Sequence, residues 1–474
     1  MRRNHGSSRL TERPAAGLLS GVMILLVLAI SGAVAQDEAV PVPPRESSHV
    51  LTLDEAMRIA LERNPGIDVA LMGAESARAA ADGQRARRLP TLSFDASGRI
   101  SESLAREVVV GGEVVRSGGG RNETSDVQLT LTHTFYQSGR EEAIEEARER
   151  ARASEAGVDD AERTLLASVA TTFHSVLAQQ ELAEVADQAV SAATLHLELV
   201  DARIEAGTVA PAERLTAEAA LADAEFEAVR TVNAVWTTLT DLRALLALPP
   251  DELPVIRGDL EAPQISGDLE GWIDEALVSR PDLEAQRHRV RAGELSLRQT
   301  RINSGLSLSV QGQADYGRHT GTTGETWFIG GGLTFPLFDR QARASVDRAE
   351  ADLRGIQRAL AEQELNVTRQ ISNAWYTLQD AVGRVSAADA SVAASSTSLE
   401  VVRERYAAGV ATIIEVTDAE LSWRRASANL VQARFDRNVA WYQLQSAAGR
   451  SLIEAARADD PTITDQVGAE TVGD

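Results

Sequence analysis

The sequence contains no cysteine, and arginine accounts for all 47 basic residues, so lysine is absent as well. The first absence excludes disulfides, thiolate metal sites and a cysteine nucleophile, and the second excludes lysine-dependent catalysis. The seven histidines include no pair at the spacing of a metal site, and neither a phosphate loop with a lysine nor a GxSxG nucleophile motif occurs. The sequence therefore predicts no catalytic residue, cofactor or metal site, and we expect a protein that is not an enzyme.

Aromatic residues are scarce, at 4%. Acidic residues outnumber basic residues, 70 to 47, which gives a net charge of −23. A long chain with few aromatic side chains favours thin, alanine-rich helical layers over large globular cores. Because the phosphate backbone of DNA or RNA repels a strongly acidic protein, we expect no nucleic-acid partner.

Long apolar runs are also nearly absent. The one clear run, from Gly17 to Ile30, follows several arginines and precedes Ala33-Val34-Ala35. It is too short to span a membrane, and small residues two positions apart are typical of a signal-peptidase site. We therefore interpret residues 1–35 as a secretory signal peptide. The mature chain is expected either to be soluble beyond the inner membrane or to cross a membrane as strands.

An internal duplication organises the remainder. The segment Leu131–Tyr136 aligns with Leu333–Phe338, and the same spacing carries Gly207 onto Gly409. We therefore predict two copies of one unit, a first repeat over 51–250 and a second over 269–450. A proline-containing linker over 251–268 separates them, and the acidic, apolar-poor tail 459–474 is expected to be disordered.

Each repeat contains one very long stretch that is almost free of glycine and proline. These stretches predict helices over 139–207 and 340–409, each roughly 100 Å long at about 1.5 Å per residue. Apolar residues recur at spacings of three and four, which is typical of a coiled-coil seam. Each helix is expected to end at a glycine, Gly207 or Gly409, and to be followed by a return helix.

Four further segments alternate strictly between apolar and polar residues, at about 91–101, 126–136, 305–316 and 326–338. Such ten-residue segments are typical of outer-membrane strands, with one face toward lipid and the other toward a lumen. We expect extracellular loops over 103–125 and 318–325 between the paired strands. Four strands cannot close a barrel, so identical chains must complete it.

The chain resembles the TolC-type outer-membrane efflux protein family. The resemblance rests on Leu51–Ala56 with Asn64-Pro65 near the start, and on Arg405–Gly409 followed by Thr412–Asp418. It implies a mainly α protein with transmembrane β-structure: a homotrimer with a shared twelve-stranded barrel in the outer membrane and a helical tunnel in the periplasm. It also implies a passive exit duct for efflux or type I secretion that docks onto a periplasmic adaptor, or membrane fusion protein, and an inner-membrane transporter.

The resemblance further assigns the tunnel tip. It places Glu415 and Asp418 at the constricted periplasmic entrance, with Tyr406 as part of the gate. A spacing of three puts both carboxylates on one helical face, although acids near a helix start are also favoured simply by the helix dipole. The turns implied for adaptor docking contain Gly207, Thr208, Val209, Pro211 and Gly409.

Two other classes of protein have some of these features. A periplasmic coiled-coil adaptor is expected to carry one helical hairpin between split β-domains, and a structural protein of the cell envelope should lack amphipathic strands. Two strand pairs, each preceding a long helix, favour the channel. The transported substrate does not follow from the chain, because the inner-membrane pump selects it.

Overall fold

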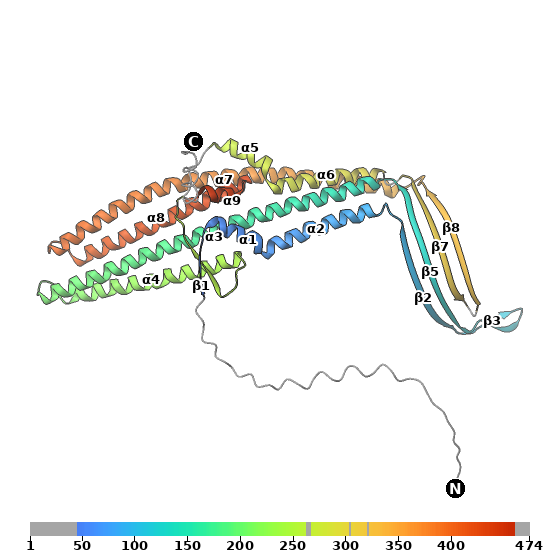
Figure 1. The fold of residues 1–474 in the computed structure, drawn as a ribbon, viewed down its shortest axis with the longest axis horizontal. Helices are drawn as coiled ribbons and strands as arrows, with labels where there is room; N and C mark the ends of the chain where they lie inside the picture. Colours follow the sequence, from blue (N-terminus) through green and yellow to red (C-terminus); the bar gives the residue numbers. More distant parts are fainter. Residues whose placement is uncertain (1–44, 262–266, 303–304, 320–321, 460–474) are drawn as a thin grey trace, which may run out of the picture. The chain divides into compact units, whose positions relative to one another are not determined.

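The computed structural model describes residues 45–261, 267–302, 305–319 and 322–459 (Figure 1). The predicted signal peptide and the predicted tail beyond Asp459 therefore lie outside the described residues. No helix of the described chain is long and apolar enough to cross a membrane.

Two antiparallel helical hairpins dominate the described chain. Helix α3 (Arg140–Glu205) packs against α4 (Ala212–Leu245), and α7 (Arg340–Ala407) packs against α8 (Ile413–Ala448). Helices α3 and α8 also contact each other, which joins the two hairpins side by side (Figure 1). The long helices thus occupy 140–205 and 340–407, where the sequence predicts 139–207 and 340–409.

Each hairpin is preceded by a pair of shorter helices and two strands. The first pair is α1 (Leu53–Arg63) and α2 (Pro65–Ala86), and the second is α5 (Leu269–Ser279) and α6 (Pro281–Ile302). A capping box between Thr52 and Glu55 begins α1, and Pro65 begins α2 directly after Asn64. Helices α2 and α6 both pack against α3. A last helix, α9 (Leu452–Asp459), contacts α1, α3 and α8.

One antiparallel sheet contains all four predicted strands in the order β2-β5-β7-β8. These are β2 (Thr91–Ser103), β5 (Gly120–Gln137), β7 (Ser307–His319) and β8 (Thr322–Thr334). They extend into the regions predicted as loops, because backbone pairing continues through polar residues such as Thr322 and Thr323. The predicted loop 103–125 also holds a hairpin of β3 (Arg106–Val110) and β4 (Glu113–Ser117).

The predicted linker 251–268 contains a strand that the sequence reasoning missed. Strand β6 (Glu252–Ile256) pairs in parallel with β1 (Arg45–Leu51), which directly precedes the first helix. Leu51, Leu253 and Ile256 are buried in the main core. Five residues give too short a pattern to recognise, and the partner strand lies some two hundred positions away in the sequence.

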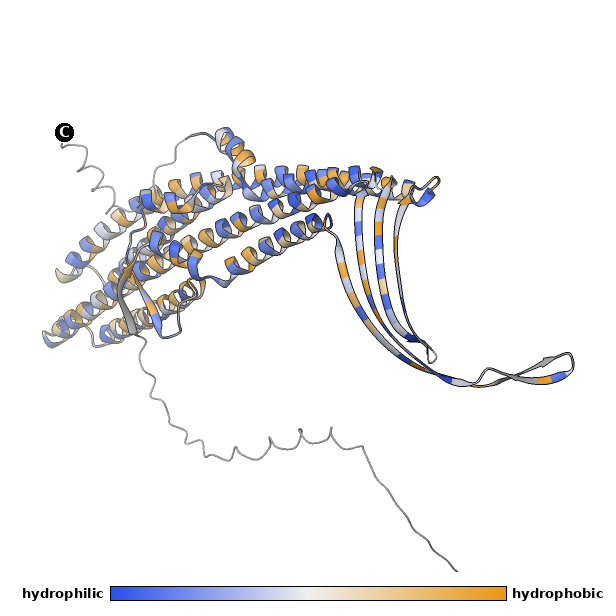
Figure 2. Ribbon diagram, turned by 45° about the vertical axis from the view of Figure 1, so that its right-hand side comes forward, coloured by the Kyte–Doolittle hydropathy of each residue, from blue (hydrophilic) through white to orange (hydrophobic). Residues whose placement is uncertain are grey.

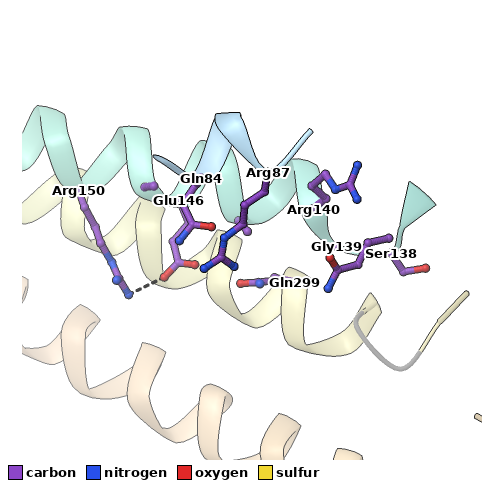
Figure 3. A pocket seen from close by; sticks show the side chains of 11 residues that line it. Gln84, Arg87, Ser138, Gly139, Arg140, Glu146, Arg150 and Gln299 are labelled. Atoms are coloured by element: carbon purple, nitrogen blue, oxygen red, sulfur yellow. Dashed lines mark ion pairs between the residues drawn. The ribbon is translucent and has the colours of Figure 1, made fainter. Parts of the chain in front are cut away.

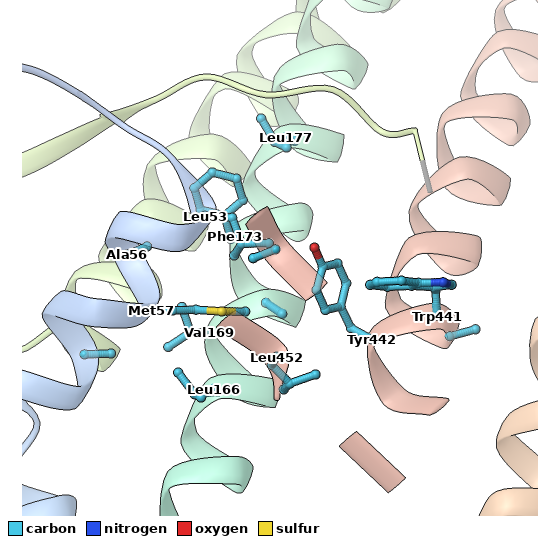
Figure 4. Close-up of a cluster of buried hydrophobic side chains, with 14 of the residues drawn as sticks. Leu53, Ala56, Met57, Leu166, Val169, Phe173, Leu177, Trp441, Tyr442 and Leu452 are labelled. Atoms are coloured by element: carbon cyan, nitrogen blue, oxygen red, sulfur yellow. The ribbon is translucent and has the colours of Figure 1, made fainter. Parts of the chain in front are cut away.

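The main hydrophobic core lies where α1, α3, α5, α7, α8 and α9 meet. Figure 4 shows Met57 and Phe173 on one side of this core and Trp441 with Tyr442 on the other. His174 is buried beside the Tyr442 ring, with ring centroids 5.1 Å apart. Neither ring nitrogen of His174 has a hydrogen-bond partner among the described residues, and burial lowers the pKa of His174 to about 4.

We expect this buried histidine to make stability depend on pH. In the unfolded chain its pKa is near 6.5, so the unfolded state binds more protons between about pH 4 and 6.5. The free energy of unfolding should therefore fall as pH falls through this window, by at most about 1.4 kcal/mol per pH unit for each chain.

The variant His174→Gln cannot titrate in this range, so the slope of stability against pH should be smaller than in the wild type. Denaturant unfolding of the solubilised protein, followed by circular dichroism at pH 4.5, 5.5 and 6.5, measures both slopes. Equal slopes in the two proteins would contradict a buried neutral histidine.

Candidate functional site

The strand register collects the apolar residues of the sheet on one face. Leu129 lies between Phe94 of β2 and Ala314 of β7, and Ala314 lies opposite Trp327 of β8. This face is open: Phe94 is 68% exposed and Trp327 is 78% exposed. Figure 2 shows hydrophobic and hydrophilic residues alternating along the strands. A continuous exposed apolar surface on a sheet is suited to contact with lipid.

The opposite face of the sheet is polar and is linked by side-chain hydrogen bonds. Ser97 donates through Oγ to Asp126 Oδ1 at 2.8 Å, across β2 and β5. Gln313 donates through Nε2 to both carboxylate oxygens of Asp315, at 3.0 and 2.9 Å. On β5 the polar residues Gln128 and Thr130 are less exposed than their apolar neighbours. An apolar face opposite a polar face is the pattern of a membrane β-barrel wall, with lipid on one side and water on the other.

The two outer strands each pair on one side only within the described residues. Strands β2 and β8 are the edges of the sheet, so each presents a row of backbone N–H and C=O groups. Water can satisfy these groups, whereas hydrocarbon cannot. A sheet with an exposed apolar face and two open edges is therefore incomplete in a membrane.

The tips of the two long hairpins have equivalent turns. Gly207 and Gly409 adopt φ angles of +68° and +77°, a conformation that favours glycine. The amide of Thr208 donates to the Arg203 carbonyl at 3.0 Å, and that of Val410 donates to the Arg405 carbonyl at 2.9 Å. Of the other predicted docking residues, Thr208 and Pro211 are exposed, Val209 is half-buried, and Pro211 is the N-cap of α4.

Glu415 and Asp418 lie on the first turns of α8 but differ in their surroundings. Glu415 completes a capping box, since its Oε1 accepts a hydrogen bond from the Thr412 amide at 3.1 Å. Its Oε2 forms a separate ion pair, 3.5 Å from Arg405 Nη1. Hydrogen bonds from Thr412 lower the pKa of Glu415. Asp418 is exposed, and its carboxylate forms no hydrogen bond or ion pair with the described part of the chain. Glu415 thus has a local structural role in addition to its predicted place at the entrance.

Tyr406 ties the two hairpins together near the tip. It is only 2% exposed and packs in a small core with Val200, Ala217, Ile413 and Val416. Its hydroxyl donates to Glu213 Oε2 at 3.1 Å on α4, and Arg203 Nη1 of α3 donates to its carbonyl at 2.7 Å. The Arg203 guanidinium also lies 4.5 Å from the ring centroid. Burial and the bond to Glu213 raise the pKa of Tyr406.

The sequence reasoning missed Arg203 and Glu213, although the internal repeat carries a signal for both. The spacing that aligns Gly207 with Gly409 also aligns Arg203 with Arg405 and Glu213 with Glu415. Both pairs lie at the tips of their hairpins. Elsewhere in the described chain, no group of three or more histidine and carboxylate side chains is placed to hold a metal ion.

The sheet has one apolar and one polar face, and its strands join long helical hairpins. This combination is typical of channels whose β-structured membrane part continues into a helical part. The family model for outer membrane efflux proteins matches residues 56–248 and 272–450. The chain therefore belongs to the outer membrane efflux protein family. This confirms the resemblance seen in the sequence and excludes the adaptor and structural-protein alternatives.

Individual relatives span most of the chain. The pyoverdine export outer membrane protein OpmQ of Pseudomonas putida is 26% identical over 86% of this chain and 87% of its own. The alkaline protease secretion protein AprF of Pseudomonas aeruginosa is 23% identical over 85% and 86%. Among solved structures, CusC has a TM-score of 0.71 at 17% identity and covers 87% of this chain and 98% of its own. The CmeC channel of Campylobacter jejuni has a TM-score of 0.69 at 17% identity, with 86% and 90% covered.

Members of the family are outer-membrane channels of efflux and secretion systems whose tunnels extend into the periplasm. The class of function and the localisation predicted from the sequence are thereby confirmed. The family is one of passive channels and not of enzymes.

We expect the variant Tyr406→Phe to loosen the tip without disturbing the rest of the fold. The change removes the hydrogen bond to Glu213 and keeps the ring packing, which should cost about 1 kcal/mol of local stability. Hydrogen exchange measured by mass spectrometry should then show faster exchange in peptides covering 403–415. The control Tyr376→Phe alters an exposed tyrosine of the same helix and should change nothing. Unaltered exchange at the tip in Tyr406→Phe would show that the bond to Glu213 does not hold the hairpins together.

Proposed function

We propose that three copies of this chain assemble into one closed channel, in which each sheet contributes four strands to a twelve-stranded outer-membrane barrel. The observation that carries the proposal is the continuous exposed apolar face on a sheet whose two edge strands each pair on one side only within the described residues. Pairing β8 of one copy with β2 of the next satisfies both edges, and the apolar face then meets lipid. The β3–β4 hairpin lies at the extracellular end, because it joins the ends of β2 and β5 that are remote from the helices.

Exposed apolar side chains on the outer helices support the same assembly below the membrane. On α4, Phe226 and Val229 are each 72% exposed, and on α7, Leu365 is 73% exposed. Helices α4 and α7 lie at opposite ends of the row α4-α3-α8-α7 formed by their contacts. The α4 face of one copy packing on the α7 face of the next would bury these side chains and close a helical tunnel.

The two repeats, 51–250 and 269–450, fit this architecture as quasi-equivalent units. Each contains two short helices, two strands of the large sheet, and a long hairpin in the same order. Three copies then provide six similar hairpins around the tunnel.

The assembled channel acts as a passive exit duct. Its hairpin turns, with Gly207, Thr208, Val209, Pro211 and Gly409, dock onto a periplasmic adaptor that connects to an inner-membrane transporter. Its relatives include a pyoverdine export protein and an alkaline protease secretion protein. This range supports a duct whose substrate is set by its pump.

We expect the purified protein in mild detergent to have the mass of three chains. The double variant Phe226→Glu with Val229→Glu should shift it toward smaller species, because the charges would have to be buried at the proposed interface. The control Val278→Glu alters an exposed valine of α5 and should leave the mass unchanged. Light scattering that finds a stable wild-type monomer would refute the assembly.

We also expect Glu415 and Asp418 to form acidic rings at the tunnel entrance that favour cations. Three-fold symmetry places three copies of each carboxylate around one axis, where anions are repelled. The change Glu415→Gln with Asp418→Asn removes both charges and keeps a side chain that can complete the capping box. Cation selectivity and block by multivalent cations in planar bilayers should both weaken.

The pH dependence of the same recordings provides a second test. Protonation of Glu415 removes its charge, and hydrogen bonds from Thr412 lower its pKa, so wild-type cation selectivity should persist at neutral pH and fall only at acid pH. The control Glu225→Ala removes an exposed acid on α4, away from the tip, and should retain wild-type behaviour. Wild-type selectivity in the double variant would mean that these acids only stabilise the start of α8 and do not set the ion selectivity of the channel.

A further inference from the structure

A cavity of about 160 Å³ lies at the junction between the sheet and the helices. It is bounded by the end of α2, the start of α3 and the end of α6. Figure 3 shows the side chains of Arg87, Gln84, Glu146 and Gln299 gathered between these helices, with Ser138 and Gly139 toward the strand. The proposed entrance and docking turns lie at the other end of the long helices, so this cavity is separate from them.

The charge around the cavity is positive, although the protein as a whole is strongly acidic. Arg87, Arg140 and Arg150 line it together with a single carboxylate, Glu146. Arg150 Nη2 pairs with Glu146 Oε1 at 2.5 Å, which leaves two cationic groups without a matching acid in the lining. The nearby Glu141 is already paired with Arg88.

Both remaining arginines have unused donors. The Arg87 side chain forms no hydrogen bond or ion pair with any other described residue. Arg140 donates from Nη2 to the Thr134 carbonyl at 2.8 Å, and its Nε is buried without a partner in the described chain. Buried donors are normally satisfied, so a ligand that accepts a hydrogen bond from Arg140 Nε, with the exposed Arg87 side chain beside it, would complete this site.

The start of α3 adds a further source of positive potential. Its N-cap is Gly139 at φ +80°, and no side chain caps the helix. The free N–H groups of the first turn and the dipole of this 66-residue helix favour an anion beside Gly139, which lines the cavity. A Cβ on Gly139 would lie 3.2 Å from both Cγ and the carbonyl of Gln299. Glycine therefore lets the end of α6 approach the start of α3 closely.

The register of the sheet indicates which side the cavity opens on. Gln137 lines the cavity and lies opposite Ser307 in the β5–β7 ladder. Ser307 is on the same face as Ser309 and Gln311, which is the polar face of the sheet. In the proposed channel this face is the lumen, so placing the cavity in the lumen rests on the proposed function.

We propose that this cavity binds an oxyanion group, a carboxylate or a phosphate, of an anionic solute in the lumen. Arg87 and Arg140 supply charge-assisted hydrogen bonds, and the start of α3 supplies backbone donors. In an assembly of three chains, three such sites form a basic collar between the barrel and the tunnel. Anionic cargo that has crossed the acidic entrance meets favourable positive potential at this level.

Inorganic pyrophosphate is a suitable probe for the purified full-length protein in detergent. Titration calorimetry should find saturable binding to the wild type. The variant Arg87→Gln should weaken binding about tenfold or more, and Arg87→Lys should retain most of it, because the charge remains. The control Arg85→Gln removes the same charge from an exposed position on α2 outside the cavity and should leave the affinity unchanged.

Three results would overturn the proposal. The first is a wild type that shows no saturable binding, and the second is an equal loss in Arg87→Gln and Arg85→Gln. The third is Arg87-dependent binding of phosphatidylglycerol micelles without binding of pyrophosphate, which would assign the cavity to a lipid headgroup.

Light scattering and bilayer conductance on the same samples separate this proposal from the proposed function. A conducting trimer without Arg87-dependent binding refutes only the site. A monomer that still binds pyrophosphate through Arg87 refutes the channel and keeps the site.

Discussion

The backbone groups along the outer edges of β2 and β8 are the constraint on which the rest of the architecture depends. In hydrocarbon each unpaired N–H or C=O costs several kcal/mol, and the four-stranded sheet offers no internal solution. In the proposed assembly, closure through further copies satisfies the edges and also sets the arrangement of the helices. All four strands of the sheet join helices at the same end of the sheet: β2 follows α2, β5 leads into α3, β7 follows α6 and β8 leads into α7. In the proposed channel, a closed ring of strands would therefore continue as a ring of helices.

The helical part is adapted to this role by small side chains. Ala151, Ala153, Ala156, Ala170 and Ala178 are all buried in α3, and the large apolar side chains are concentrated in one core around Phe173 and Tyr442. Close packing of alanine lets long helices lie side by side as a thin layer. A thin layer cannot bury both of its lateral ends. Exposed apolar residues accordingly remain on α4 and α7, and in the proposed assembly a neighbouring chain covers them.

The sequence predicted the parts of this fold that repeat a pattern many times. Alternation over ten residues identified all four strands of the sheet, and the long stretches without glycine or proline identified α3 and α7. Strand β6 was missed because five residues carry little pattern and its partner β1 is distant in the sequence. At the tip, Glu415 was located by family resemblance, whereas its bonds to Thr412 and Arg405 depend on local turn geometry. Contacts between hairpins, such as Tyr406 with Glu213, cannot be read from periodicity at all.

The tips of the two predicted repeats differ in their contacts. Arg203 and Glu213 align with Arg405 and Glu415, but Ile204 stands where the second repeat has Tyr406. In the second repeat Arg405 and Glu415 interact within their own hairpin. In the first repeat the equivalent residues, Arg203 and Glu213, form hydrogen bonds with Tyr406 of the other hairpin instead. The second hairpin therefore keeps its own internal contact if the two separate, whereas separation would break the contacts of Arg203 and Glu213 with Tyr406. At the tip, polar contacts between the hairpins thus centre on one buried tyrosine and its two partners, whereas farther along the helices the hairpins are held by the main core and by the Arg163 hydrogen bonds to Ser446.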